Sequence, residues 1–260
     1  MSLIVEKIHS KVITLTLNRV DKHNALSAQF VSELNVYFEA LNERIRKSPH
    51  TIRALVIQSA STKAFCAGAD LKERFSMSED DVLKTLQNQL SMMNSLRSIS
   101  VPTIALMEGV AFGGGLELAL HCDFIYAHPK AKMGLTETKL GIIPGAGGTV
   151  LLKERVGTVL AKKLIFSAEP IEAKRAFNLG IVDCCSENIQ QDLNDFLEKI
   201  VLGAPLAIIA AKKALSLKPN QYLERIAFEN LCYKETLNTL DRIEGLMAFK
   251  EKRTPNYEGR

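Results

Sequence analysis

The chain has 260 residues, 47% of them hydrophobic and 24% charged, which is the composition of a folded globular protein with a sizeable core. A formal net charge of +4 is well short of a nucleic-acid-binding signature and is compatible with an anionic small-molecule substrate. Five cysteines without a C-x-x-C spacing argue against a disulfide framework or a zinc site and favour a reducing compartment.

The amino terminus, MSLIVEKIHSK, lacks the basic and apolar regions of a secretory signal and the Arg and Ser content of a transit peptide. The apolar stretches are too short to span a bilayer. We therefore expect a cytoplasmic protein without a membrane partner, and an already processed organellar chain is the alternative.

Strand-like and helix-like patterns alternate in the first half of the chain. Residues 12–17 alternate apolar and polar side chains, whereas residues 28–47 carry apolar side chains on one helical face. This alternation predicts an α/β fold with parallel crossovers, and no sequence repeat is visible. Further expected elements are strands at 54–58, 101–107 and 123–127 and a helix at 79–97.

Helical patterns dominate from about residue 156 onward. We predict a domain of residues 1–200 that carries the chemistry and a helical region at 201–260, which packs either on a neighbouring subunit or on its own core. Pro205 suits a first helical turn, and Pro170 and Pro219 mark breaks. The expected helical stretches are 157–180, 187–202, 204–217 and 221–250.

The stretch FCAGADLKER (65–74) is the first with chemical content. Its small residues, Ala67 to Ala69, let the backbone approach a ligand closely, so the N–H of Ala69 could donate to a carbonyl oxygen. Lys72 lies three residues further on, within reach of a phosphate. A tight strand-to-helix turn is the alternative interpretation.

A glycine run, Gly113 to Gly115, leads directly into the apolar helix pattern LELALHC. The free N–H groups and the dipole of a helix start favour negative charge, which is the geometry that stabilises an oxyanion. Glu117 lies in the first turn among apolar neighbours. Taken alone, such a glutamate would more often be a surface residue.

Glu137 follows twenty positions after Glu117 and precedes a second glycine cluster, residues 145–148. Because Val150 follows Thr149, this cluster is not a phosphate-binding loop. A turn that holds a water molecule with its backbone is the alternative use. H-E-x-x-H and G-x-S-x-G motifs are absent, and neighbouring His121, Cys122 and Asp123 would point in different directions on a helix.

Taken in this order, the three stretches resemble the crotonase (enoyl-CoA hydratase/isomerase) superfamily. The matching motifs are A-G-A-D-[LI]-K at 67–72, G-G-G-x-E-L-A at 113–119 and G-x-x-E-x-x-x-G-I-x-P-G-x-G-G-T at 134–149. Residues 18–26 and 241–253 are similar to the family's terminal elements, although Val20 replaces the usual Pro. The resemblance implies a spiral of ββα units with a C-terminal helical trimerisation region, assembled as a trimer or a dimer of trimers.

The resemblance also implies the site residues and an acyl-CoA thioester as substrate, with no separate cofactor and no metal. It makes Glu117 and Glu137 the catalytic carboxylates, the N–H groups of Ala69 and Gly114 the oxyanion-hole donors, and Gly145 a holder of the catalytic water. The residues that it places at coenzyme A are Ala67, Gly68, Ala69, Asp70, Leu71 and Lys72, with Lys22 and a neighbouring subunit's Lys250 near the phosphates.

Chemical reasoning supports a hydratase. Adding water across the 2,3 double bond of an enoyl thioester builds negative charge on the thioester oxygen, which two N–H groups can stabilise. One carboxyl group must activate water and another must protonate Cα. We assign these tasks to Glu117 and Glu137, respectively, although two close carboxyl groups titrate as a pair and the roles could be exchanged. A double-bond isomerase, the rival enzyme, needs one acid/base, and the family's isomerases usually lack the glutamate matching Glu117.

Within the superfamily, residues 65–74, 131–145 and 244–253 are most similar to the methylglutaconyl-CoA hydratase branch of leucine degradation. That branch also binds AU-rich RNA through a lysine-rich helix. The corresponding segment here, 34–47, mixes basic and acidic residues, so we do not expect RNA binding, which is the non-enzyme alternative. Whether the acyl group is methylglutaconyl or a short straight chain of fatty acid oxidation stays open, because no cation for the extra carboxylate stands out.

Overall fold

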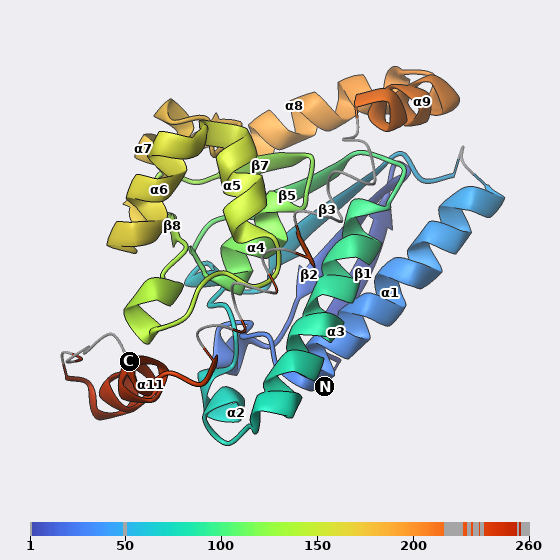
Figure 1. Ribbon diagram of the computed structural model, residues 1–260. Coiled ribbons are helices and arrows are strands. Elements are labelled where there is room, and N and C mark those ends of the chain that lie inside the picture. The colour runs from blue at the N-terminus through green and yellow to red at the C-terminus, as the bar shows by residue number, and fades with distance from the viewer. Residues whose placement is uncertain are drawn as a thin grey trace.

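Two β-sheets organise the chain in the computed structural model, which describes residues 2–48, 51–215, 226–227, 230, 234, 237–253 and 255 (Figure 1). The six-stranded sheet has the order β1-β2-β3-β5-β7-β10, and the four-stranded sheet has the order β4-β6-β8-β9. The strands of the first sheet are β1 (Ile4–His9), β2 (Val12–Leu17), β3 (Ala54–Ser59), β5 (Thr103–Met107), β7 (Phe124–Ala127) and β10 (Cys184–Cys185). Those of the second are β4 (Ala64–Cys66), β6 (Val110–Phe112), β8 (Lys132–Gly134) and β9 (Ile171–Glu172).

The chain visits the two sheets in turn. Strands β3, β5 and β7 lie parallel in the six-stranded sheet, and each is followed by β4, β6 or β8 in the four-stranded sheet. A helical segment follows each second strand: α2 (Leu71–Phe75) with α3 (Glu79–Arg97), then α4 (Gly114–Leu120), then the 3-10 helix η2 (Glu137–Leu140). This is the expected spiral of ββα units, and its repeat lies in the topology rather than in the amino acids.

Both faces of the six-stranded sheet are covered. On one face, α1 (Ala28–Lys47) packs beside α3, and its apolar side, including Phe30, Leu34 and Phe38, is fully buried (Figure 1). On the other face, α8 (Ile189–Leu202) packs against β3 and β7 through Leu193. Because the central strands are buried on both faces, they consist of continuous apolar runs. The remaining helices are η1 (Val20–Lys22), α5 (Gly148–Val156), α6 (Thr158–Ser167), α7 (Ala173–Asn178), α9 (Pro205–Leu215) and α11 (Leu240–Glu251).

The predicted strands at 12–17, 54–58, 101–107 and 123–127 and the predicted helices at 28–47 and 79–97 are confirmed within two residues. The prediction of an uninterrupted helix at 157–180 is wrong. Strand β9 separates α6 from α7, because Pro170 ends helical geometry and Ile171 pairs with Met133 of β8. Residues 221–239 of the predicted last helix fall mostly outside the described residues, and the predicted boundary at residue 200 stays a prediction.

Four cysteines, Cys66, Cys122, Cys184 and Cys185, are free thiols, and Cys232 lies outside the described residues. Burial raises the pKa of Cys66 and that of Cys122 to about 12, so neither thiol is a ready nucleophile. None of the helices in the described part of the chain combines the length and the apolar character that crossing a membrane requires.

Candidate active site

Three predicted functional elements lie at one edge of the four-stranded sheet. Strands β4, β6 and β8 are parallel neighbours, so their carboxyl ends meet at the same edge. Ala69 follows β4, Gly114 follows β6, and Glu137 follows β8, each within three residues of the strand end. Ligands of parallel sheets commonly bind outside the carboxyl ends of the strands. The topology therefore brings together residues that are up to 68 positions apart in the sequence.

Glycines allow the Ala69 and Gly114 backbones to approach each other. Gly68 has a φ of +91°, and a Cβ there would lie 2.6 Å from the carbonyl oxygen of Phe112 and 3.4 Å from the N atom of Gly114. A Cβ on Gly114 would lie 3.8 Å from the N atom of Ala69. Neither of these two N–H groups donates a hydrogen bond within the described part of the chain. The pair has the arrangement of an oxyanion hole.

Glu117 is almost completely buried, with 2% of its surface exposed. Its Oε1 atom accepts hydrogen bonds from the backbone N–H groups of Ala146, at 2.8 Å, and Gly148, at 2.9 Å. A Cβ on Gly148 would lie 2.9 Å from this oxygen. The glycine turn that we expected to hold a water thus holds the carboxylate of Glu117 and fixes its orientation.

Glu137 begins η2 and is 9% exposed. Its Oε1 atom lies 3.0 Å from the position that a Cβ on Gly113 would take, directly beside the start of α4. Both glutamates line one pocket together with Ala69, Gly114 and Gly145. The structure therefore brings together the five residues predicted to act in catalysis.

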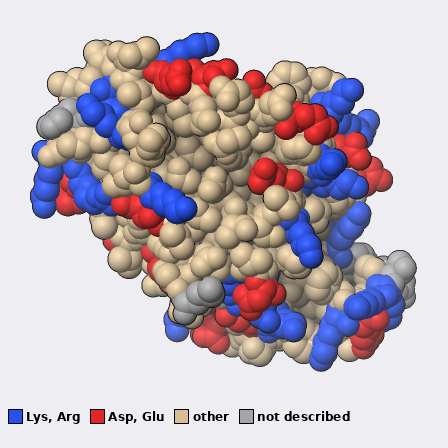
Figure 2. All heavy atoms as spheres, turned by 180° about the vertical axis from the view of Figure 1, so that it is seen from behind, with Lys and Arg blue, Asp and Glu red and all other residues tan. Residues whose placement is uncertain are grey.

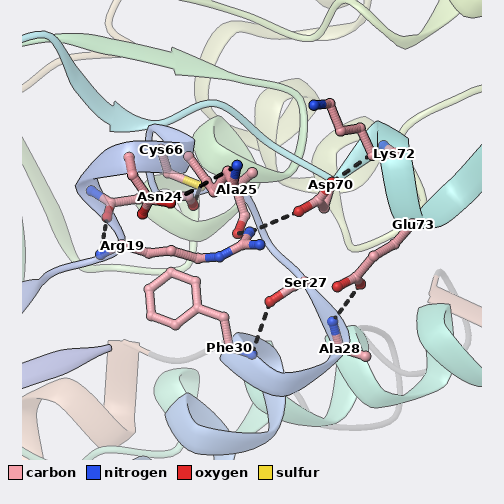
Figure 3. Close-up of polar contacts among 12 residues, drawn as sticks. Arg19, Asn24, Ala25, Ser27, Ala28, Phe30, Cys66, Asp70, Lys72 and Glu73 are labelled. Carbon is pink, nitrogen blue, oxygen red and sulfur yellow. Dashed lines mark hydrogen bonds and ion pairs between the residues drawn. The ribbon is translucent and has the colours of Figure 1, made fainter. Parts of the chain in front are cut away.

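Polar contacts hold the segment that carries Ala69 (Figure 3). Asn24 is fully buried, and its amide donates to the carbonyl oxygen of Phe65 and to the hydroxyl group of Ser59. The thiol of Cys66 donates to the carbonyl oxygen of Asn24 at 3.1 Å. Arg19 forms an ion pair with Asp70 at 2.8 Å. The loop at 18–26, which resembles a family motif, thus supports the segment that follows β4.

Of the residues predicted at coenzyme A, Ala69 and Leu71 line the pocket, and the roles of the others stay a prediction. Leu71 lines the pocket, whereas the side chain of Asp70 pairs with Arg19 and accepts from the N–H of Lys72 at 3.2 Å. Lys22 and Lys72 are exposed. Within this chain the Nζ atom of Lys250 lies 4.8 Å from the centre of the Phe75 ring, and the contribution of a neighbouring subunit's Lys250 to the coenzyme A phosphates stays a prediction. This contact joins α11 to α2.

Sequence reasoning missed three polar side chains that line the same pocket, Arg74, Gln89 and Arg242. Arg74 is 9% and Gln89 4% exposed. A signal existed for Gln89, since it shares the buried face of α3 with Val82, Leu86 and Met93. Arg74 stands in a charged run that reads as a solvated helix, so nothing in the sequence marks it as buried.

His121, Cys122 and Asp123 do not form a catalytic cluster. The Nδ1 atom of His121 lies 2.8 Å from the carbonyl oxygen of Glu117, one helical turn earlier. Burial lowers the pKa of His121 to about 4, so the ring is neutral at physiological pH. Asp123 instead accepts from Lys212 of α9 and from Thr103 of β5. These residues hold α4 and α9 against the sheet.

A larger cavity, about 500 Å³, lies between the outer face of the six-stranded sheet and α8. Among the described residues that line it, Glu198 is the single carboxylate. The strands that form its floor, β2 and β3, are paired on both edges, so their backbone N–H groups are used in the ladders with β1, β5 and each other. This cavity therefore lacks the parts of an oxyanion hole and is a poorer candidate site.

Basic residues in the segment 34–47, where the related branch has its lysine-rich RNA-binding helix and where we expected no RNA binding, are paired with acids. Arg44 lies 2.8 Å from Glu6, and both Arg46 and Lys47 contact Glu43. On the face of the molecule shown in Figure 2, the described Lys and Arg residues lie among Asp and Glu residues around a broad uncharged area. That distribution differs from the continuous basic stripe that nucleic acid binding favours.

Comparisons with known proteins agree on one family. The family model described as enoyl-CoA hydratase/isomerase matches residues 7–260. The chain is 40% identical over 266 aligned positions to mitochondrial methylglutaconyl-CoA hydratase of Homo sapiens, covering 98% of this chain and 76% of that protein. It is 39% identical to the probable enoyl-CoA hydratase 2, mitochondrial, of Arabidopsis thaliana, covering 96% and 82%. A crystal structure of enoyl-CoA hydratase from Bacillus anthracis is 37% identical and superposes with a TM-score of 0.79 over the whole of both chains.

Proposed function

Because the chain belongs to the enoyl-CoA hydratase/isomerase family, we propose that it is a hydratase that adds water syn across the 2,3 double bond of an enoyl-CoA thioester. The observation that carries the proposal is the meeting of two buried glutamates with two backbone N–H donors in one pocket. Hydratases are also named among its relatives, from human to Bacillus anthracis. Enzyme chemistry of this kind is lyase chemistry and uses coenzyme A as part of the substrate.

The N–H groups of Ala69 and Gly114 would bind the thioester oxygen. During addition of water the carbonyl becomes enolate-like, and preorganised donors stabilise that charge more than they stabilise the ground state. Gly114 is the first residue of α4, so the positive end of the helix dipole points at the same oxygen. This arrangement accounts for polarisation of the double bond without a metal ion.

The two glutamates would divide the proton transfers. Glu117, held by the turn at 146–148, would accept a proton from the attacking water, which Gly145 helps to position. Glu137, beside Gly113 and hence beside the thioester carbon, would deliver the proton to Cα. Both carboxyl groups line the same pocket, and syn addition requires them to serve the same face of the double bond. The shared pocket supports syn addition.

The proposed enzyme would be an oligomer, and it would work in an organelle. Leu202, the last residue of α8, and Leu215, the last residue of α9, are 86% and 85% exposed, and a neighbouring subunit in a trimer or a dimer of trimers would cover such residues. The human and Arabidopsis thaliana relatives are named as mitochondrial, which supports an organellar setting over a cytoplasmic one. The named acyl groups of relatives leave methylglutaconyl and simple enoyl substrates as the two candidates.

The test is a pair of conservative substitutions, Glu117→Gln and Glu137→Gln. Each should lower kcat for hydration of crotonyl-CoA by about 10²- to 10⁴-fold, since each removes an acid or base but keeps the shape of the side chain. A matched control is Glu172→Gln, an exposed glutamate of β9 outside the pocket. Full hydratase activity in either pocket variant would refute the two-carboxylate mechanism. Two results together would establish the isomerase instead. The wild type would isomerise 3-enoyl-CoA but show no hydratase activity, and Glu117→Gln would keep the wild-type isomerase rate.

A further inference from the structure

The side-chain amide of Gln89 lines the active-site pocket without a hydrogen-bond partner. Gln89 belongs to the buried face of α3 and is 4% exposed. Within the part of the chain that the structure describes, neither the nitrogen nor the oxygen of this amide takes part in a hydrogen bond. Because buried amides are nearly always paired, an unpaired amide at the wall of a pocket indicates that a ligand atom is its partner.

The Gln89 amide lies beside the two backbone donors of the proposed oxyanion hole. The position that a Cβ on Gly114 would take is a common reference point for the three groups. The Nε2 atom of Gln89 is 2.7 Å from this point, and the N atom of Ala69 is 3.8 Å from it. The N atom of Gly114 itself lies about 2.5 Å from it by standard covalent geometry. Three nitrogen atoms that carry hydrogen therefore surround one small region of the pocket.

The surroundings of the Gln89 amide are otherwise apolar. Leu26 Cδ1 lies 3.0 Å from the same reference point, and Leu86, one helical turn earlier on α3, also lines the pocket. An unpaired amide among apolar side chains lowers the stability of the protein without ligand, and a leucine there would not. The benefit of the amide therefore comes from a bound molecule. In an enoyl thioester, the polar atom at this end of the pocket is the thioester oxygen, which the two backbone N–H groups would bind.

We propose that Gln89 is a catalytic residue, whose side-chain amide donates a third hydrogen bond to the thioester oxygen in the oxyanion hole. In the bound substrate that oxygen has two lone pairs, which the N–H groups of Ala69 and Gly114 occupy. As the oxygen gains negative charge in the transition state, it becomes able to accept a third bond. The Gln89 bond is therefore stronger in the transition state than in the ground state, and it acts on kcat rather than on KM. This inference rests on the proposed hydratase function, because it takes an enoyl-CoA thioester as the ligand.

The kinetic experiment compares Gln89→Leu with Gln87→Leu in the hydration of crotonyl-CoA. Gln87 is exposed on the same helix, so the control makes the same substitution outside the pocket and should leave both constants unchanged. In Gln89→Leu we expect kcat to fall by about 10- to 100-fold and KM to change by less than about threefold, because a donor that acts in the transition state is lost. An unchanged kcat, or a rise in KM without a fall in kcat, would overturn the third donor.

Thermal melting of the protein without ligand distinguishes a catalytic from a structural role. We expect Gln89→Leu to melt at the wild-type temperature or above it, because leucine replaces an unpaired polar group on an apolar helix face. The variant would then be folded and less active. A lower melting temperature together with a lower kcat would mean that Gln89 holds the fold, which refutes the proposal.

A bound chromophore reports the third donor without requiring hydration. In 4-dimethylaminocinnamoyl-CoA the amino group pushes electrons toward the thioester oxygen, so hydrogen bonds to that oxygen move its absorption to longer wavelength. We expect the same red shift with the wild type and with Gln87→Leu, and a shift about one third smaller with Gln89→Leu, since one donor of three is removed. Equal red shifts in all three proteins would contradict a bond from Gln89 to the thioester oxygen.

The two assays keep the failure of the proposed function apart from the failure of the third donor. If the wild type does not hydrate crotonyl-CoA but Gln89→Leu reduces the red shift, the hydratase proposal fails and the donor assignment stands. If the wild type is a hydratase and Gln89→Leu changes neither kcat nor the red shift, the donor assignment fails alone. A wild type that leaves the spectrum of the chromophore unchanged would also overturn the donor assignment, because no group would then polarise the thioester.

Discussion

The two backbone donors of the proposed oxyanion hole are positioned by different interactions. Gly114 starts a helix in which every residue is buried, so packing and the helix itself fix its N–H group. Ala69 belongs to no strand and pairs with Leu26 in an isolated bridge. Its segment is tied down by hydrogen bonds and an ion pair from the loop at 18–27 (Figure 3). One donor therefore depends on close contact, and the other depends on polar partners.

This difference teaches where the site tolerates change. Packing contacts at α4 leave almost no space, so even one added carbon atom should be felt. Polar contacts at the Ala69 segment are several and partly redundant, so the loss of one should weaken the site without destroying it. Substitutions on the two sides should thus differ in size and in kind.

The largest effect should come from Gly115→Ala, on the packed side. A Cβ there would lie 2.0 Å from the carbonyl oxygen of Cys66, so α4 and the end of β4 must separate. In open space this change would favour the helix. Here we expect the free energy of unfolding to fall by about 3 kcal/mol or more, with loss of hydratase activity, because backbone cannot yield as a side chain can.

Urea unfolding and the crotonyl-CoA assay measure both effects. The control is Gly157→Ala, where an added Cβ meets no atom within 4 Å but φ is +77°. That control should cost about 1–3 kcal/mol for conformation alone, because φ +77° with ψ 166° is a backbone conformation essentially restricted to glycine. If Gly115→Ala were no worse than Gly157→Ala, close contact would not be what positions Gly114.

The second prediction concerns how the free energy of unfolding depends on pH through His121, which follows α4 on the packed side of the site. Burial lowers its folded-state pKa to about 4, against about 6.5 in the unfolded chain. The unfolded state therefore takes up a proton below pH 6.5 that the folded state refuses. The stability contributed by neutral, buried His121 is fully present above pH 6.5 and is lost as the pH falls from 6.5 to 4. At pH 5 the free energy of unfolding should therefore be about 2 kcal/mol lower on account of this residue.

Urea midpoints at pH 7 and pH 5 test this, with His121→Gln as the partner protein. The variant should lose about 2 kcal/mol less than the wild type on acidification, since glutamine does not titrate. Equal losses of free energy of unfolding in the two proteins would show that groups other than His121 cause the acid sensitivity.

The sequence located the long elements of the fold better than the short ones. The helices at 28–47 and 79–97 carry several apolar repeats, so periodicity located them. Strands β4, β6 and β8 have three residues each, too few to show any alternation, and they exist because neighbouring strands pair with them. The glutamates and glycines of the site were found because they stand in motifs. Gln89 could have been found from its place on the apolar face of α3, whereas Arg74 could not, because its burial depends on elements that meet only in the folded chain.

On the polar side, Asn24 should show the larger effect. It is fully buried, donates to Ser59 and Phe65, accepts from the N–H of Arg19, and has a φ of +54°. Asn24→Gly keeps the conformation accessible and removes the hydrogen bonds, so we expect the free energy of unfolding to fall by about 2 kcal/mol. Asn24→Ala should cost about 1 kcal/mol more, for its left-handed backbone.

Equilibrium unfolding of both variants measures the two contributions, and the crotonyl-CoA assay measures the effect on the Ala69 segment. We expect kcat to fall by about tenfold in each, less than in Gly115→Ala, because the bridge between Leu26 and Ala69 stays in place. Complete loss of activity in a folded Asn24→Gly protein would contradict the idea that the polar contacts are redundant.

The smallest effect should come from the ion pair between Arg19 and Asp70. Their side chains are 16% and 12% exposed and lie 2.8 Å apart. Asp70→Asn keeps the cap on the N–H of Lys72 and removes one charge, so the free energy of unfolding should fall by about 1 kcal/mol. A cycle with Arg19→Met isolates the pair from the bond that Arg19 donates to the carbonyl oxygen of Ala25. A coupling free energy of about 1 kcal/mol, with kcat reduced about threefold, would show that the pair positions Ala69. A coupling free energy near zero would mean that Asn24 and the bridge to Leu26 position Ala69 without the ion pair. The two donors would then differ less, because fewer polar contacts would set Ala69 apart from the packed Gly114.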